Sequence, residues 1–150
     1  TIFDYWGVPE HQKWMNNGAF DGKQLSDEQK RLRQFYSNLL NLSGKNRAFV
    51  SGEYVDLTAY NKEQGNFNDQ LYACLRVSGD QRFLIIAGFQ STERKVTVTI
   101  PDDVATRAGL TSGAKRTVKD VLWNQAEVEF DGRTLTCTLG AFGAYIYQLH

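Results

Sequence analysis

The sequence predicts a mainly β fold, an antiparallel β-sandwich of Greek-key-like type preceded by a loop and one amphipathic helix. From Arg47 onward, apolar residues recur with a period of two in short runs. Turn residues such as Asp131-Gly132 and Gly79-Asp80 separate these runs. No long segment of helical period lies between them, so we expect consecutive strands to pair in antiparallel fashion.

Residues 1–23 show no sustained period of either kind, and they are rich in aromatic residues. The five aromatics are Phe3, Tyr5, Trp6, Trp14 and Phe20. Since neither period is sustained, we predict a long ordered loop. Such loops inside compact domains tend to serve a function. A second interpretation is that the aromatics merely pack the loop onto its own domain.

Residues 26–43 predict an amphipathic helix with one apolar stripe. The stripe comprises Leu32, Phe35, Tyr36, Leu39 and Leu40. Ser26 followed by Gln29 fits a capping box at the start of the helix, and Gly44 offers a left-handed stop at its end. The stripe must bury against something, so we expect it to fold onto the sandwich or to pair two chains as a dimer.

Nine runs of period two predict the strands of the sandwich. They are residues 48–51, 53–57, 71–77, 83–89, 95–100, 117–123, 127–130, 134–139 and 144–149. Asp131-Gly132 predicts a two-residue hairpin, and residues 78–81 predict a second hairpin. Asp102 and Asp103 after Pro101 indicate the start of a short turn or helix rather than a pair of catalytic carboxylates.

Charge and composition exclude several classes of function. Lys plus Arg number 17 and Asp plus Glu number 17, so the basic excess typical of nucleic-acid binders and of membrane-surface patches is missing. The longest apolar run, residues 83–89, is far shorter than the roughly 20 residues that span a bilayer. We therefore expect no nucleic acid and no membrane among the partners. Cys74 and Cys137 lie within strand-like runs, and two free thiols are favoured over a disulfide.

A search for catalytic patterns finds none. The two histidines, His11 and His150, show no metal-ligand spacing, and nucleophile-elbow and phosphate-loop motifs are missing. We predict no catalytic, metal-binding or cofactor-binding residue in this sequence. Tyr5, Trp6 and Trp14 are the candidates for sugar contact, because exposed aromatic rings stack on sugar rings. The alternative is that these rings bury against a neighbouring domain.

A succession of motifs resembles one enzyme family. IFDYWGVPE at 2–10 is followed by LSDEQK at 25–30, LRQFYSNLLNL at 32–42 and RAFVSGEY at 47–54, and GAYIYQL at 143–149 closes the chain. This order resembles the end of the catalytic (β/α)8 barrel and the following β-sandwich, domain C, of glycoside hydrolase family 13, the α-amylase family. The resemblance implies that residues 1–44 belong to the barrel, with its last helix at 24–44, and that residues 45–150 form domain C.

The resemblance also implies a function. Family members cleave α-glucosidic bonds with retention, using three carboxylates on earlier barrel strands, and none of those motifs occurs here. The chain is then the noncatalytic tail of an α-amylase-like hydrolase, with the barrel of the same parent chain as its partner and a secreted or periplasmic parent. Two other hypotheses remain: a carbohydrate-binding module that presents Trp6, Trp14 or Trp123 to α-glucan, and an independent protein-interaction sandwich.

Overall fold

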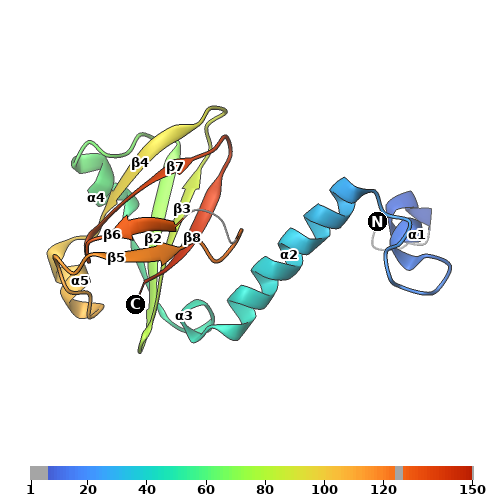
Figure 1. Ribbon diagram of the computed structural model, residues 1–150, viewed down its shortest axis with the longest axis horizontal. Coiled ribbons are helices and arrows are strands. Elements are labelled where there is room, and N and C mark those ends of the chain that lie inside the picture. The colour runs from blue at the N-terminus through green and yellow to red at the C-terminus, as the bar shows by residue number, and fades with distance from the viewer. Residues whose placement is uncertain (1–6, 124–126, 150) are drawn as a thin grey trace. The chain divides into compact units, whose positions relative to one another are not determined.

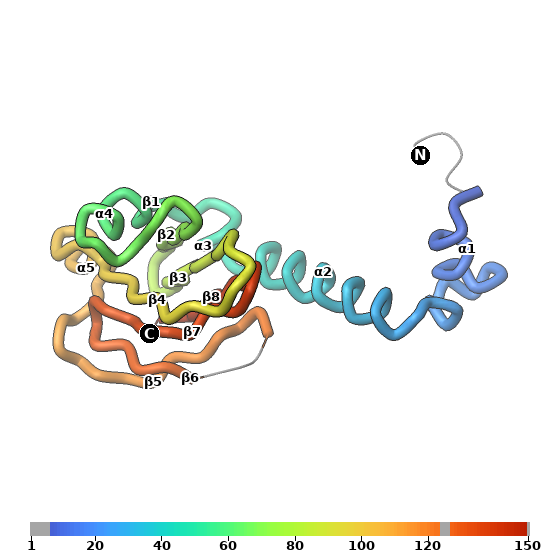
Figure 2. Tube along the Cα trace, turned by 90° about the horizontal axis from the view of Figure 1, so that it is seen from above, coloured from blue at the N-terminus to red at the C-terminus, as the bar shows by residue number. Residues whose placement is uncertain are grey.

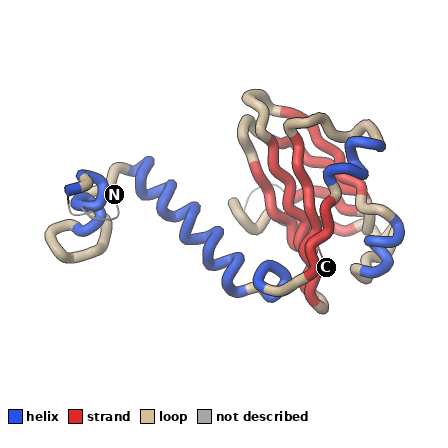
Figure 3. The backbone as a smooth tube through the Cα atoms, turned by 180° about the vertical axis from the view of Figure 1, so that it is seen from behind, coloured by secondary structure: helices blue, strands red, loops and turns tan. Residues whose placement is uncertain are grey.

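The computed structural model describes residues 7–123 and 127–149, and the chain divides into two compact units, Thr1–Asn41 and Leu42–His150. Figure 1 labels the helices and strands in chain order. The eight strands of the described residues all lie in the second unit, and Figure 3 colours these strands red.

The first unit contains α1 (Pro9–Met15) and the start of α2 (Asp27–Lys45). Helix α1 corrects the prediction of a loop through residues 1–23. Its seven residues are too few for a helical period to be visible, and its start depends on Pro9, which sits at the first helical position where a missing N–H costs nothing. The helix ends at Asn16, which adopts a left-handed φ of 46°.

Helix α2 confirms the predicted helix and its capping box. The Ser26 N–H donates to Gln29 Oε1 at 3.0 Å, and the Gln29 N–H donates to Ser26 Oγ at 3.2 Å. The predicted stop at Gly44 is wrong, because the helix continues to Lys45. Asn46 caps the end instead, since its Nδ2 donates to the carbonyl of Leu42 at 2.7 Å.

The second unit is the predicted antiparallel β-sandwich, built from two four-stranded sheets (Figure 2). The first sheet has the order β1 (Glu53–Asp56), β2 (Leu71–Ser78), β3 (Gln81–Gly88) and β8 (Ala144–Leu149). The second has the order β4 (Arg94–Thr99), β7 (Thr134–Leu139), β6 (Glu127–Phe130) and β5 (Arg116–Lys119). All registered pairs are antiparallel.

The core lies between the inner faces of the two sheets. In the first sheet, Leu75, Leu84 and Tyr147 stand opposite one another on neighbouring strands and are fully buried. Large side chains of the second sheet, such as Phe130 and Leu135, face them and are also fully buried. Each such side chain contributes about 1.5–3 kcal/mol by leaving water. Cys74 and Cys137 are buried free thiols, as predicted.

Both predicted hairpins are present. Ser78 pairs with Gln81 across a two-residue turn, in which Gly79 has a φ of 59°. The second hairpin has three turn residues rather than two, because β6 ends at Phe130 and β7 begins at Thr134. Gly132 in this turn cannot carry a side chain, since an added Cβ would lie 1.9 Å from the carbonyl oxygen of Thr111.

Three short helices complete the unit. They are α3 (Arg47–Val50), α4 (Thr58–Glu63) and α5 (Asp102–Arg107). Helix α5 begins at Asp102 as expected, whereas α3 replaces the strand predicted at residues 48–51. The reason is tertiary: the Arg76 guanidinium donates hydrogen bonds to the carbonyl oxygens of Ala48 and Phe49, which a strand would have used in a ladder.

Asp120 joins the two sheets at one side of the sandwich. It forms an isolated bridge with Tyr147 of β8, and it is completely buried. Its carboxylate accepts hydrogen bonds from the backbone N–H groups of Leu122 (3.2 Å), Trp123 (2.8 Å) and Ile146 (3.0 Å). The strand predicted at residues 117–123 therefore ends at Lys119, because this carboxylate turns the chain.

Candidate functional site

The predicted sugar-contacting residues fall into two groups. Tyr5 and Trp6 lie outside the described residues. Trp14 is half-buried in the first unit, with its ring centroid 5.4 Å from that of Phe20 in an edge-to-face arrangement and 5.9 Å from that of His11. Trp14 therefore helps to hold its own unit together. Its sugar contact stays a prediction.

The outer face of the β1-β2-β3-β8 sheet has an apolar centre, bordered by the polar side chains of Asp56, Arg76 and Gln148. The strand register aligns its side chains in rows across the sheet. The members of this apolar outer face are Tyr54, Tyr72, Cys74, Phe83, Ile85, Ala87, Ala144 and Ile146. The central row runs from Cys74 through Ile85 to Ile146. Cys74 and Ile146 are already buried within the unit, each 5% exposed, and Ile85 between them is half-buried.

Helix α3 covers one end of the apolar outer face. Phe49 packs on Phe83 with ring centroids 4.7 Å apart. Arg76, which belongs to the same face of β2, fixes the helix by donating to the carbonyl oxygens of Ala48 at 2.9 Å and Phe49 at 3.0 Å. The Arg76 guanidinium is therefore bonded within the unit at the end of the face that α3 covers.

Away from α3, the apolar outer face carries Tyr54 and Tyr72. Tyr54 is 49% exposed, and its hydroxyl accepts a hydrogen bond from the Tyr72 hydroxyl at 3.3 Å. Burial raises the pKa of the Tyr72 hydroxyl and of the Cys74 thiol above their ordinary values. Both groups are therefore neutral at pH 7.

The outer face of the β4-β7-β6-β5 sheet is polar throughout. Alternation with the buried core residues places these side chains on it: Lys95, Thr97, Thr99, Thr117, Lys119, Glu127, Glu129, Thr134, Thr136 and Thr138. Thr97 and Thr136 are cross-strand partners with their hydroxyl oxygens 2.9 Å apart. This is the composition of a sheet face that meets water.

Trp123 lies just beyond β5, at the boundary of the apolar outer face. Its indole Nε1 donates to the carbonyl oxygen of Ala144 at 2.9 Å, and the residue is 45% exposed. Sequence reasoning identified Trp123 but not its exposed neighbour Phe142, on the loop between β7 and β8. No pattern around a single phenylalanine between glycines signals such exposure.

Among residues 7–123 and 127–149, no group of three or more His, Cys, Asp or Glu side chains is placed to hold a metal ion. In the same ranges, no helix has the length and apolarity that crossing a membrane requires. The outer face of the β1-β2-β3-β8 sheet is therefore the feature with the clearest functional content.

A scan against protein-family models and a search of curated proteins both found no match. Solved structures do match. A variant of AmyP in complex with maltotriose matches 86% of this chain with a TM-score of 0.63 at 16% identity. The α-amylase from Geobacillus thermoleovorans complexed with acarbose matches 88% with a TM-score of 0.60 at 17% identity, and isomaltulose synthase from Klebsiella sp. matches 87% with a TM-score of 0.54 at 19% identity.

These likenesses establish the fold. The resemblance to α-amylase-type enzymes that the sequence predicts is thus confirmed at the level of the fold. The present chain covers 22%, 26% and 19% of the AmyP, α-amylase and isomaltulose synthase chains, so it spans only a fifth to about a quarter of their length. The matched structures include both an α-amylase and an isomaltulose synthase, and a shared fold does not transfer either activity.

Proposed function

We propose that this chain is the noncatalytic end of an α-amylase-like glycoside hydrolase that acts on α-glucans. In this proposal residues 1–44 complete the catalytic barrel, and residues 45–150 form a domain that packs on the barrel and stabilises it. The contrast between the two outer faces of the sandwich carries the proposal. The polar outer face has the composition of a surface in water, whereas the apolar outer face, with Ile85 at its centre, has the composition of a surface that contacts protein.

The helix that precedes the sandwich supports the same proposal. No side chain of α2 is buried, and Leu32, Tyr36 and Leu40 of its apolar stripe are each more than half exposed. Removing such side chains from water is worth about 1.5–3 kcal/mol apiece. A helix on the outside of a barrel gains that energy by packing on the barrel strands.

Substitution on the apolar outer face of the complete natural protein tests the docking. Ile85→Lys would place a charge in the interface, whereas the matched control Thr136→Lys places the same charge on the polar outer face. We expect Ile85→Lys to cost the complete protein about 2–4 kcal/mol of stability, because an unpaired charge is buried. The control should change stability by less than about 0.5 kcal/mol. Equal melting temperatures for the two variants would contradict the docking proposal.

Activity of the 150-residue chain tests the noncatalytic assignment separately. Incubation with soluble starch or an activated maltooligosaccharide should release no reducing ends above the buffer control. Turnover that a single Asp or Glu substitution within the chain abolishes would overturn this part of the proposal.

A further inference from the structure

A shallow depression of about 300 Å³ lies beside the loop that joins β7 and β8. Trp123, Phe142 and Tyr145 supply its aromatic wall, and Gly140, Ala141, Gly143 and Ala144 complete its lining. No lining side chain is charged. An added Cβ at Gly140 would meet nothing within 4 Å, so the space above this glycine is open.

Two of these aromatic residues are held in place by backbone hydrogen bonds. The Trp123 N–H donates to Asp120 Oδ2 at 2.8 Å, and the indole Nε1 donates to the carbonyl oxygen of Ala144 at 2.9 Å. The Phe142 N–H donates to the carbonyl oxygen of Gln90 at 2.8 Å. The Trp123 ring and the backbone of Phe142 therefore stand in fixed positions before any ligand arrives, which lowers the entropic cost of binding.

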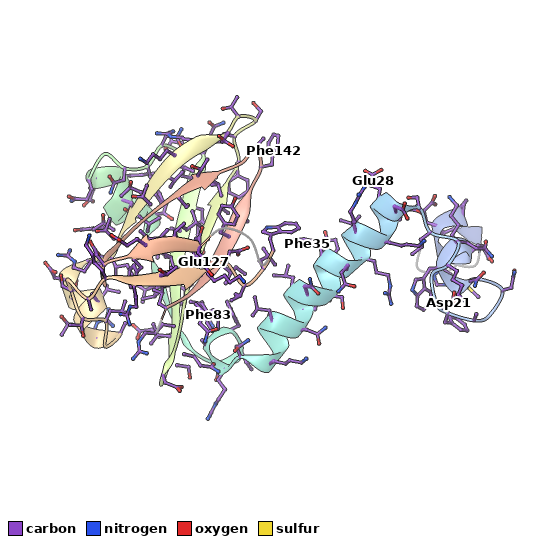
Figure 4. All side chains as sticks on the ribbon, in the orientation of Figure 1. Asp21, Glu28, Phe35, Phe83, Glu127 and Phe142 are labelled. Atoms are coloured by element: carbon purple, nitrogen blue, oxygen red, sulfur yellow. The ribbon has the colours of Figure 1, made fainter. Side chains whose placement is uncertain are left out.

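Phe142 is an unfavourable residue for its position. Its φ of 48° lies in the left-handed region, where a bulky side chain is strained and Gly or Asn is comfortable. The side chain is 71% exposed, so packing within the unit does not compensate for the strain. Figure 4 labels Phe142 on this loop. Strain of this kind is typical of binding sites.

We propose that this depression binds a pyranose unit of a neutral oligosaccharide. Aromatic faces pack on the apolar face of a sugar ring, and backbone groups meet its hydroxyls. The uncharged lining favours a neutral ligand over a phosphate, a nucleotide or an acidic peptide. The depression borders the apolar outer face at Ala144, but the proposal stands independently of docking on a barrel because it concerns Trp123 and Phe142.

Binding to soluble starch and maltoheptaose by the 150-residue chain tests the proposal. Electrophoresis through a native gel that contains soluble starch should retard the chain, and calorimetry should detect maltoheptaose binding. Phe142→Asn removes the ring but suits the left-handed backbone. We expect this variant to lose the retardation and to bind maltoheptaose at least tenfold more weakly, with a melting temperature equal to or above that of the unsubstituted chain.

Phe89→Asn is the matched control. Phe89 is a comparably exposed phenylalanine, 66% against 71%, that does not line the depression, and its substitution should leave retardation unchanged. Absence of retardation for the unsubstituted chain would overturn the proposal. So would binding that survives Phe142→Asn but is lost in Trp14→Ala, which would move the sugar site to the first unit. A chain that forms dimers and becomes monomeric with Phe142→Asn, without sugar binding, would show that the rings contact protein.

Discussion

The two sheets of the sandwich share one core but differ on their outer faces. The apolar outer face places Cys74, Ile85 and Ile146 in one row, whereas the polar outer face places Thr97 beside Thr136. Strand alternation gives each strand one buried side in either case. The difference teaches that the inner residues build the fold, while the outer residues decide what the fold can bind to.

The largest effect is expected at the residue that connects α3 to the apolar outer face. Arg76→Ala leaves the carbonyls of Ala48 and Phe49 without their donor and loosens the cover over Phe83. We expect a loss of about 2–3 kcal/mol in the free energy of unfolding, because both hydrogen bonds are charge-assisted. Urea denaturation of the 150-residue chain measures it.

Lys119→Ala on the polar outer face is the control for Arg76→Ala. Lys119 is exposed, and its substitution should change stability by no more than about 0.5 kcal/mol. If the two variants unfolded at the same urea concentration, the basic residues of the two faces would be equivalent and the comparison would fail.

A second prediction concerns the two buried thiols at alkaline pH. Burial raises the pKa of Cys137 to about 11 from an ordinary value of 9.0, and it raises the pKa of Cys74 as well. The unfolded chain therefore ionises first. The stability that Cys137 contributes is present below about pH 9 and is lost as the pH rises towards 11.

Comparing the pH dependence of unfolding between Cys137→Ala and Cys74→Ala separates the two sheets. We expect Cys137→Ala to remove part of the stability loss between pH 9 and 11, whatever it costs at neutral pH through the smaller side chain. An unchanged alkaline slope in Cys137→Ala would show that this thiol does not ionise differently in the two states.

The smallest effect on stability is expected for the double substitution Thr97→Val and Thr136→Val. This variant directly reduces the difference between the two outer faces. It removes the paired hydroxyls and makes the centre of the polar outer face apolar. Since both partners of the hydrogen bond are replaced, we expect a change of less than about 1 kcal/mol in stability. Self-association should increase, and analytical ultracentrifugation at several concentrations measures it. An unchanged mass would show that the surface character of this face is unimportant.

Period and turn chemistry were enough to predict most of the sandwich. Apolar alternation located β1 to β8 to within a few residues, and the capping box at Ser26 located the start of α2. These features are local, so one stretch of sequence contains the whole signal. The fold class followed from them, whereas the resemblance to α-amylase-type enzymes came from the order of the motifs at 2–10, 25–30, 32–42, 47–54 and 143–149.

The features that sequence reasoning missed depend on distant partners. Helix α3 depends on Arg76, and the end of β5 depends on the backbone of Ile146, which lies 26 residues beyond Asp120. The exposure of Phe142 depends on its hydrogen bond to Gln90, on a different loop. The apolar outer face itself could not be predicted, because a row across three strands exists only once the register is known.

The place of β8 in the first sheet affects how the sandwich is made on the ribosome. β8 is the last strand of the sandwich, yet β3 pairs with it from Arg82 to Ala87, and Asp120 bonds to its backbone. Synthesis proceeds from the N-terminus, so β2 and β3 emerge as a hairpin with one edge unpaired and stay so until β8 has been translated. During that interval the nascent hairpin exposes both an open strand edge and its apolar faces, which is the kind of surface that chaperones bind. Closure of the first sheet therefore waits until β8 has been translated, however fast the β2-β3 hairpin itself folds.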